Sequence, residues 1–242
     1  MTSNDGAPRL DSHKQTIDEP EFATRTEAAY SRLHEAIVNG SLAPGQKLLL
    51  RNLIDETGFG ASSLREALSR LVSDRLVRVS GQRGYWVEEI SREAFEDILE
   101  LRLLLEPEGL VRSVANATPD WEVAVIDAHE KLARVEEALD GDRDALGRQW
   151  ELGNRAFHHA LIQNCGSPWL LHFVEMLAEQ SERYRRKGIS SHAVPKEKLL
   201  AEHKAICDAA LERNGPLAGE LLKAHIRNSA KGLLAAVFPA KP

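Results

Sequence analysis

The feature that most constrains the fold of this chain is a change of residue periodicity near position 90. Before it, Leu76–Val79 and Tyr85–Val87 alternate as two short strands around a tip, 80–84, that contains two glycines. After it, no convincing strand pattern occurs up to Val237, and apolar residues recur at helical spacing. This change predicts a mainly α protein whose β-structure is confined to the first part of the chain.

The second part of the chain divides into six helix-length segments. The breaks between them are mostly marked by glycine or proline, and the expected helices cover residues 92–116, 119–140, 142–164, 167–187, 195–213 and 215–237. Helices of this length joined by short connections favour an antiparallel bundle. We therefore expect an all-α bundle domain at residues 90–238.

The first part predicts a disordered tail followed by a small domain. Residues 1–24 are polar and acidic with little apolar periodicity, which indicates a disordered N-terminal tail. Residues 25–89 follow the order helix, helix, helix, hairpin. Gly58 is expected to end the second helix in a left-handed conformation, and Ser62 or Ser63 is expected to cap the third helix.

From the composition and the polar N-terminal residues we expect neither a membrane-spanning nor a secreted protein. No apolar run approaches the roughly 18 residues of a membrane span, and the polar N-terminus has no apolar leader. Cys165 and Cys207 form no CxxC pair and are interpreted as small core residues of a reduced protein. We expect a cytoplasmic protein without a membrane partner.

Basic residues concentrate locally although the net charge of the chain is −6. Between residues 60 and 87, five arginines face two acidic residues. A helix that opens with Ser62, Ser63 and Arg65, followed by a basic hairpin, can enter a DNA major groove and contact the flanking backbone.

The alternative is that these arginines are ordinary solvated helix charges. Arg51 on the preceding helix and Gln82, Arg83 and Gly84 at the hairpin tip favour DNA contact over that alternative, because all of them belong to one helix–helix–hairpin arrangement. A dimer would double the small number of phosphate contacts.

These motifs together resemble the winged helix-turn-helix of the GntR family of bacterial transcription regulators. The resemblance covers Tyr30 to Val87 and includes Pro44-Gly45-Gln46-Lys47-Leu48, Leu64-Arg65-Glu66-Ala67-Leu68 and Arg83-Gly84. It implies DNA contacts at Arg51, Gly60, Ala61, Ser62, Ser63, Arg65, Gln82, Arg83 and Gly84.

This chain departs from the family pattern at three positions. Gly60 stands where the family usually has Ser or Thr, and Ala61 stands where it usually has Arg. Arg75 replaces a glycine that precedes the first strand of the wing. The loss of an arginine at position 61 removes one expected contact, so these departures bear on the operator sequence.

Three histidines of the second part are candidates for a metal site. His158, His203 and His225 are expected on three different helices, and Asn154 shares a helix face with His158. Three imidazoles that converge inside a bundle can hold a divalent ion. The alternative is three ordinary histidines that are exposed or hydrogen-bonded, since their long sequence separation does not show convergence.

The second part resembles the helical FCD domain of FadR-like members of the same family. The matching residues are Arg102 with Glu106, Asn154 to His158, Leu200 to Ile206, and His225-Ile226. The resemblance implies a divalent metal, zinc before nickel or manganese, held by Asn154, His158, His203 and His225. The family usually has Asp at the first of these positions. Asn is a weaker, uncharged donor, so the metal affinity or preference should differ.

The resemblance also implies a small carboxylate or sugar-acid effector beside the metal. Arg102 is the candidate for the effector carboxylate, through a bidentate pair; the alternative is a salt bridge from Arg102 to Glu106 on the same helix. His159 is expected on the surface and His172 at the edge of the core. The basic run 183–187 is interpreted as a solvated helix end, with one arginine over the effector cavity as the alternative.

The leading hypothesis is therefore a ligand-controlled transcription regulator, more commonly a repressor, that binds a pseudo-palindromic double-stranded DNA operator as a homodimer. One alternative is a metal-dependent hydrolase that uses the three histidines with Glu202 as the base, although no HExxH motif is present. Another alternative is an architectural DNA-binding protein without an effector.

Overall fold

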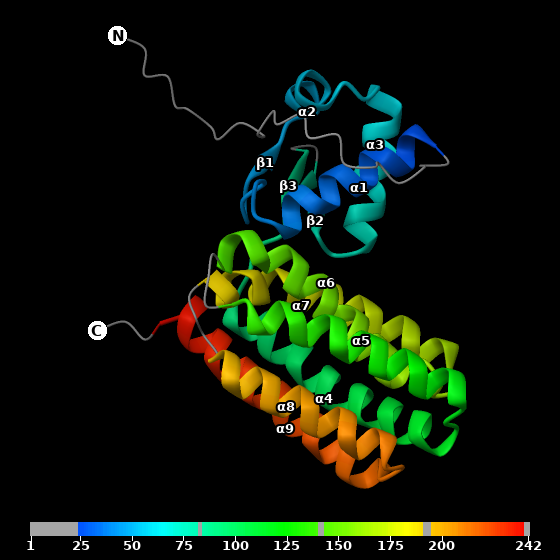
Figure 1. Cartoon of the computed structure of the whole chain (residues 1–242). Coiled ribbons are helices and arrows are strands. Elements are labelled where there is room, and N and C mark those ends of the chain that lie inside the picture. Colours follow the sequence, from blue (N-terminus) through cyan, green and yellow to red (C-terminus); the bar gives the residue numbers. More distant parts are fainter. Residues whose placement is uncertain (1–23, 82–83, 140–142, 191–194, 240–242) are drawn as a thin grey trace. The chain divides into compact units, whose positions relative to one another are not determined.

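The computed structural model describes residues 24–81, 84–139, 143–190 and 195–239 (Figure 1). The expected tail at 1–24 lies outside the described residues except for Thr24. The described chain divides into two compact units with the boundary between Glu89 and Ile90. Each unit has its own hydrophobic core.

The first unit packs three helices against a small antiparallel sheet. Its helices are α1 (Arg25–Val38), α2 (Leu50–Thr57) and α3 (Ala61–Ser73). The strands β1 (Lys47–Leu48), β2 (Val77–Val79) and β3 (Tyr85–Val87) form a sheet of order β1-β3-β2, in which Lys47 and Arg78 both pair with Trp86. The expected winged helix-turn-helix is thus present.

The turn between α2 and α3 begins at Gly58. Gly58 has φ +71° and caps the C-terminus of α2, as the sequence predicted, because a residue without Cβ adopts this conformation without strain. The predicted capping role of Ser62 or Ser63 is wrong. The N-cap of α3 is Gly60, and both serines lie inside the first turn, since α3 begins at Ala61.

The second unit is a bundle of long helices. Among the described residues these are α4 (Arg92–Ala115), α5 (Pro119–Glu137), α6 (Arg143–Ile162), α7 (Pro168–Ser190), α8 (Lys196–Leu211) and α9 (Gly215–Val237). Figure 1 shows them side by side along a common direction. The mainly α fold is confirmed, and α7 continues three residues beyond its expected end at 187.

Small residues bring α4 and α9 close together. A Cβ built on Gly219 of α9 would lie 3.0 Å from Cγ2 of Val111 on α4, and one on Gly109 would lie 2.9 Å from Leu170 Cδ2 of α7. Such contacts are tighter than ordinary van der Waals packing. Glycine at these positions therefore lets α4 approach both neighbours, and α4 carries two residues of the site described below.

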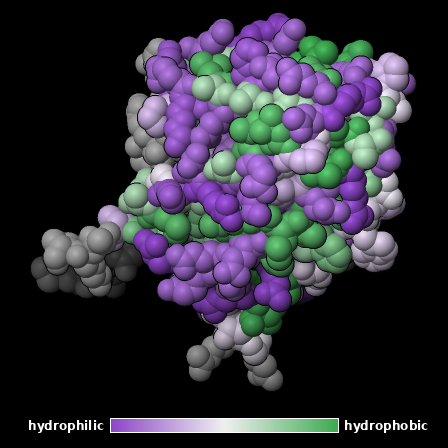
Figure 2. All heavy atoms as spheres, turned by 90° about the horizontal axis from the view of Figure 1, so that it is seen from below, coloured by the Kyte–Doolittle hydropathy of each residue, from purple (hydrophilic) through white to green (hydrophobic). Residues whose placement is uncertain are grey.

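Within the described residues, none of the helices combines the length and the apolar character that a bilayer crossing requires. Figure 2 shows one face of the molecule, on which hydrophobic residues interrupt a mostly hydrophilic surface.

Candidate metal centre and DNA-binding surface

The structure brings the three candidate histidines together inside the bundle. His158 comes from α6, His203 from α8 and His225 from α9, and one nitrogen of each lies within 4.8 Å of the others. His203 and His225 are almost completely buried, and the side chain of His158 is 12% exposed. Convergence from three helices is the arrangement that the sequence separation alone did not show.

Each of these histidines places its Nδ1 atom beside a glutamate from a helix of the bundle. His158 Nδ1 lies 3.1 Å from Glu106 Oε2, and His225 Nδ1 lies 2.8 Å from Glu202 Oε2. His203 Nδ1 lies 2.9 Å from Glu136 Oε1, in a contact that departs from ideal hydrogen-bond direction. A carboxylate only accepts hydrogen bonds. These contacts therefore favour the tautomer with the proton on Nδ1 in all three rings.

The consequence is that three Nε2 lone pairs are directed toward one region. Nε2 of His203 and Nε2 of His225 are 3.2 Å apart, and the buried Nε2 of His158 has no hydrogen-bond partner within the described residues. Two acceptor nitrogens at this distance repel each other unless a proton or a cation lies between them. Tetrahedral zinc with bonds of about 2.0–2.1 Å places its nitrogen ligands roughly 3.4 Å apart. The residues present therefore fit a divalent metal.

The local electrostatics favour the neutral form of His158 and His225. Burial lowers the pKa of His158, and burial together with the neighbouring His203 lowers the pKa of His225 to about 3. Burial would raise the pKa of Glu106, but Arg102 and His158 outweigh burial, and the pKa falls well below its usual range. Neutral imidazoles held by ionised carboxylates are the protonation states that metal binding requires.

Glu202 and Glu136, which contact His225 and His203, are each held by a further hydrogen bond. Glu202 also accepts a hydrogen bond from Asn228 Nδ2 at 2.7 Å, and Glu136 accepts one from Trp150 Nε1 at 3.1 Å. Glu202 is thus occupied in orienting His225, which leaves it poorly placed to serve as the free base that a hydrolase would need.

A cavity of about 380 Å³ opens beside His158, the one of the three candidate histidines that lines it. His158, the buried Asn154 and two arginines, Arg102 and Arg185, contribute to its wall. Its apolar wall comes from α6 and α7 and contains Leu152, Ala156, Ala160, Ile162, Leu171, Val174 and Ala178. This volume and mixed lining are typical of a site for a small organic molecule.

The alternative considered for Arg102, a salt bridge to Glu106, is present in the structure, whereas its contact with an effector carboxylate stays a prediction. Arg102 Nε donates to Glu106 Oε1 on the same helix, and Arg102 also lines the cavity. Because Glu106 in turn contacts His158, one carboxylate connects the arginine with a candidate metal ligand.

The basic run 183–187 contributes a second cavity arginine. Arg185 is 6% exposed and makes a bidentate pair with Glu151: its Nε lies 3.1 Å and 3.0 Å from the two carboxylate oxygens, and its Nη2 donates to Oε1. Arg186 pairs with Glu182, whose pKa is raised by burial and by the neighbouring Glu151. The interpretation of the whole run as a solvated helix end is therefore wrong, because Arg185 turns inward.

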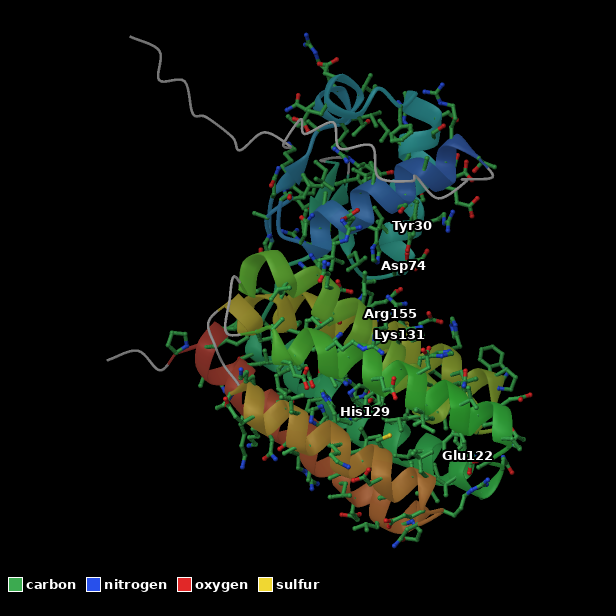
Figure 3. All side chains as sticks on the ribbon, in the orientation of Figure 1. Tyr30, Asp74, Glu122, His129, Lys131 and Arg155 are labelled. Atoms are coloured by element: carbon green, nitrogen blue, oxygen red, sulfur yellow. The ribbon has the colours of Figure 1, made fainter. Side chains whose placement is uncertain are left out.

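Other polar residues lie at the margin of the site. Arg155 lines the cavity and contacts Glu175 and Glu179 at 2.9 Å each, while His159 is exposed as expected. The expected place of His172 at the core edge is wrong, since it is exposed beside Trp169. Figure 3 labels Arg155 on α6 and His129 on α5; the ring of His129 packs 5.5 Å from that of Phe157.

The sequence reasoning missed that three glutamates orient the histidines, although it considered Glu202 as the base of a hydrolase. A signal for one of them existed, because Glu136 continues the buried face of α5 formed by Trp121, Val125, Ala128 and Leu132. An acidic residue on such a face needs a buried partner. Glu106 was considered only as a partner of Arg102, and the pairing of Glu151 with Arg185 carries no comparable sequence signal.

The predicted DNA-contact residues lie in the first unit. Arg51 on α2 and Arg65 on α3 are exposed, and no acidic residue or side-chain cap occupies the first turn of α3, where Gly60, Ala61, Ser62 and Ser63 are found. The amide groups at this helix end are therefore available to an anion. Gly84 has φ +106° at the end of the hairpin, and Gln82 and Arg83 lie outside the described residues.

Two basic residues near this surface serve packing. Arg70 stacks over the ring of Tyr30, at 4.3 Å from its centroid, and the hydroxyl of Tyr30 donates to Asp74 at 2.8 Å (Figure 3). In the sheet, Arg78 lies 5.7 Å from the centroid of Trp86. Because Arg70 packs on Tyr30, the exposed arginine near the N-terminus of α3 is Arg65.

Comparison with known proteins gives two family matches. The family described as "Bacterial regulatory proteins, gntR family" matches residues 25–87, and the family described as "FCD domain" matches residues 97–228. Together the two matches cover both units of the chain.

Two curated relatives agree with these matches. The chain is 38% identical over 203 residues to an uncharacterized HTH-type transcriptional regulator, BphR, of Paraburkholderia xenovorans, covering 84% of this chain and 82% of that protein. It is 33% identical to the HTH-type transcriptional repressor GlaR of Escherichia coli, covering 81% of this chain and 90% of GlaR.

The solved structures support the fold. A putative GntR transcriptional regulator from Rhodococcus sp. has a TM-score of 0.70 at 23% identity and covers 88% of this chain and 98% of its own, and E. coli McbR has a TM-score of 0.67 at 23% identity, covering 85% and 95%. The curated relatives named here are transcriptional regulators rather than enzymes. The chain therefore belongs to the GntR family of DNA-binding transcription regulators, with an FCD domain as its second unit.

Proposed function

We propose that this regulator is a repressor whose operator affinity is controlled by a small carboxylate bound in the cavity of the second unit, next to a divalent metal. The observation that carries the proposal is the set of three Nε2 lone pairs on His158, His203 and His225, each ring held through Nδ1 by a glutamate. A cation at this point would lie beside the cavity to which His158 contributes.

The metal would be held by the three histidines, with Asn154 as a weak fourth donor. When bound, the ion supplies a positive charge that a carboxylate oxygen can reach. Asn154 is neutral and is more readily displaced than the aspartate usual in the family. If Asn154 were displaced, a carboxylate oxygen could take its place on the ion, and zinc, nickel or manganese would suit the nitrogen-rich donor set.

Arg102 would bind and orient the effector carboxylate. It lines the cavity and already pairs with Glu106, so an effector carboxylate must compete with or join that pair. Both residues lie on α4, which begins at Arg92, three residues after the boundary between the units. An effector that binds one arrangement of α4 more tightly than another would shift the balance between DNA-binding states.

The DNA would be read by α3 and the wing. Arg65 can reach a base edge, the first turn of α3 offers amide groups to phosphate, and Arg51 with the hairpin residues Gln82, Arg83 and Gly84 contacts the backbone or the minor groove. The absence of a side-chain cap on α3 supports this role, because it leaves the helix N-terminus open to a phosphate.

An apolar stripe on the second unit supports the proposed homodimer. On α7, Trp169, Phe173 and Met176 recur at helical spacing and are exposed, with Trp169 72% exposed. On α4, which packs against α7, Leu101 and Leu104 are also exposed. A second copy of the chain would cover such a surface and match a two-fold operator.

The test begins with a selection from genomic DNA by the zinc-loaded full chain at moderate salt. Operator affinity is then measured by fluorescence anisotropy with a panel of small carboxylates and sugar acids, for zinc-loaded and chelator-treated protein. The proposal predicts that at least one carboxylate weakens operator binding about tenfold or more, in the loaded protein only. An operator whose binding responds to no carboxylate would refute the effector part, and failure to enrich any DNA would refute the whole proposal.

A further inference from the structure

Arg185 is a buried arginine whose donors are only partly used. Its Nε and Nη2 atoms bind Glu151, and Nη2 also donates to the carbonyl oxygen of Ala178 at 2.9 Å. Its Nη1 atom is buried and has no hydrogen-bond partner within the described residues. An unused buried donor on a charged group is costly, and Arg185 belongs to the wall of the cavity. The structure thus presents a donor that lacks an acceptor.

The position of this donor along the cavity differs from that of the histidines. Glu151 and His158 are both on α6, seven residues apart in the sequence, which corresponds to about 10 Å along a helix. Arg185 is tied to Glu151, whereas Arg102 is tied to Glu106 beside His158. A ligand held by its carboxylate near His158 would therefore extend toward Arg185 with its other end.

The charge of Arg185 is already neutralised. Glu151 accepts a bidentate pair from Arg185, and the adjacent pair of Arg186 with Glu182 is neutral as well. A second carboxylate at this end of the ligand would be placed near the buried carboxylate of Glu151, and the arginines among the described lining residues are already paired with glutamates. An uncharged oxygen would accept from Nη1 without that repulsion.

We propose that Arg185 is a specificity-determining residue of the effector site, and that it selects a singly charged carboxylate whose far end carries an uncharged hydrogen-bond acceptor such as a ketone oxygen. This inference rests on the proposed carboxylate effector and adds the chemical class of its second end. Hexanoate, 5-oxohexanoate and adipate form a suitable probe series, because they share six carbons and differ in the group that would face Arg185.

The experiment measures the dissociation constants of these three acids for the full-length, zinc-loaded protein by isothermal titration calorimetry. We expect 5-oxohexanoate to bind most tightly and adipate to bind most weakly. The affinity for 5-oxohexanoate should exceed that for hexanoate about tenfold, because it gains one hydrogen bond from a charged donor. Adipate as the tightest ligand, or equal affinities for hexanoate and 5-oxohexanoate, would overturn the role of Arg185 while leaving the carboxylate effector intact. Binding of none of the three would count against both.

A charge variant sharpens the result. Glu151→Gln keeps the shape of the partner side chain but frees the charge of Arg185, so adipate should gain about tenfold in affinity while hexanoate changes little. Glu179→Gln is the matched control, since it removes one carboxylate from Arg155 and leaves the contact of Arg155 with Glu175. Its order of affinities should equal that of the unmodified chain. If Glu151→Gln fails to fold, by its circular dichroism spectrum, the order in the unmodified chain decides alone.

Discussion

The two units use arginine in opposite ways. In the first unit, Arg51 and Arg65 are exposed and make no ion pair within the described residues. In the second unit, the cavity arginines Arg102, Arg155 and Arg185 are each paired with at least one glutamate. The first arrangement leaves charge available to phosphate, whereas the second cancels the charge and keeps only directed donors.

This difference matches two kinds of recognition. DNA offers many equivalent anions, so an exposed cation contributes affinity whatever the sequence, and one bidentate contact adds selectivity. A buried cavity receives one small ligand, and unbalanced charge there would be expensive. In the proposed effector site, where a metal would supply the positive charge, neutralised arginines would discriminate by geometry.

The largest expected effect comes from breaking the buried pair of the second unit. Arg185→Met leaves Glu151 buried without its partner, and we expect a loss of about 3–5 kcal/mol in the free energy of unfolding. Urea denaturation followed by circular dichroism measures the loss. The double variant Arg185→Met, Glu151→Leu should recover most of it. A single variant within about 1 kcal/mol of the unmodified chain would show that the pair is not the buried contact described here.

A smaller effect is expected from the exposed cation of the first unit. Arg65→Ala should leave the free energy of unfolding within about 0.5 kcal/mol, as for other exposed sites. It should weaken binding to the selected operator by about 1–3 kcal/mol, and binding to random DNA by less. Anisotropy titrations on both DNAs at one salt concentration make the comparison. Equal losses on the two DNAs would mean that Arg65 contacts phosphate rather than a base.

The smallest effect concerns the backbone of the first unit. Arg75 has φ +56°, in the left-handed region where the family usually has glycine. Arg75→Gly removes the strain of a Cβ in this conformation, and we expect a gain of about 0.5–1 kcal/mol in the free energy of unfolding. Gly58→Ala is the opposite test, since Gly58 has φ +71°, and it should destabilise the protein. Thermal unfolding measures both variants against the unmodified chain. A lower unfolding temperature for Arg75→Gly than for the unmodified chain would contradict this view.

Much of the fold could be predicted because the breaks are local signals. Gly58 and the segments around Pro119, Pro168 and Pro216 delimit helices whose bounds agree with the structure to within a few residues. Gly188 was expected to end α7, but the helix continues through it to Ser190. A glycine costs a helix only about 1 kcal/mol relative to alanine, which the packing of a long helix offsets.

The site was less predictable because its contacts join distant positions. The three histidines were singled out as candidates from the sequence, and the family resemblance implied their role as ligands. Their glutamate partners come from three different helices, with Glu106 and His158 separated by 52 residues. The inward turn of Arg185 depends on which face of α7 packs against α6. Neither the periodicity of one helix nor its charges shows how the next helix is placed.

The central claim is that three histidine lone pairs hold a divalent metal beside the effector cavity. Elemental analysis of the full chain, purified without chelator, tests it most directly, together with the variants His203→Ala and His172→Ala. The account predicts close to one zinc, nickel or manganese ion per chain, lost in His203→Ala and retained in His172→Ala, whose imidazole is exposed away from the cluster. A chain that contains no metal, and whose thermal stability does not change when these ions are added, would contradict it.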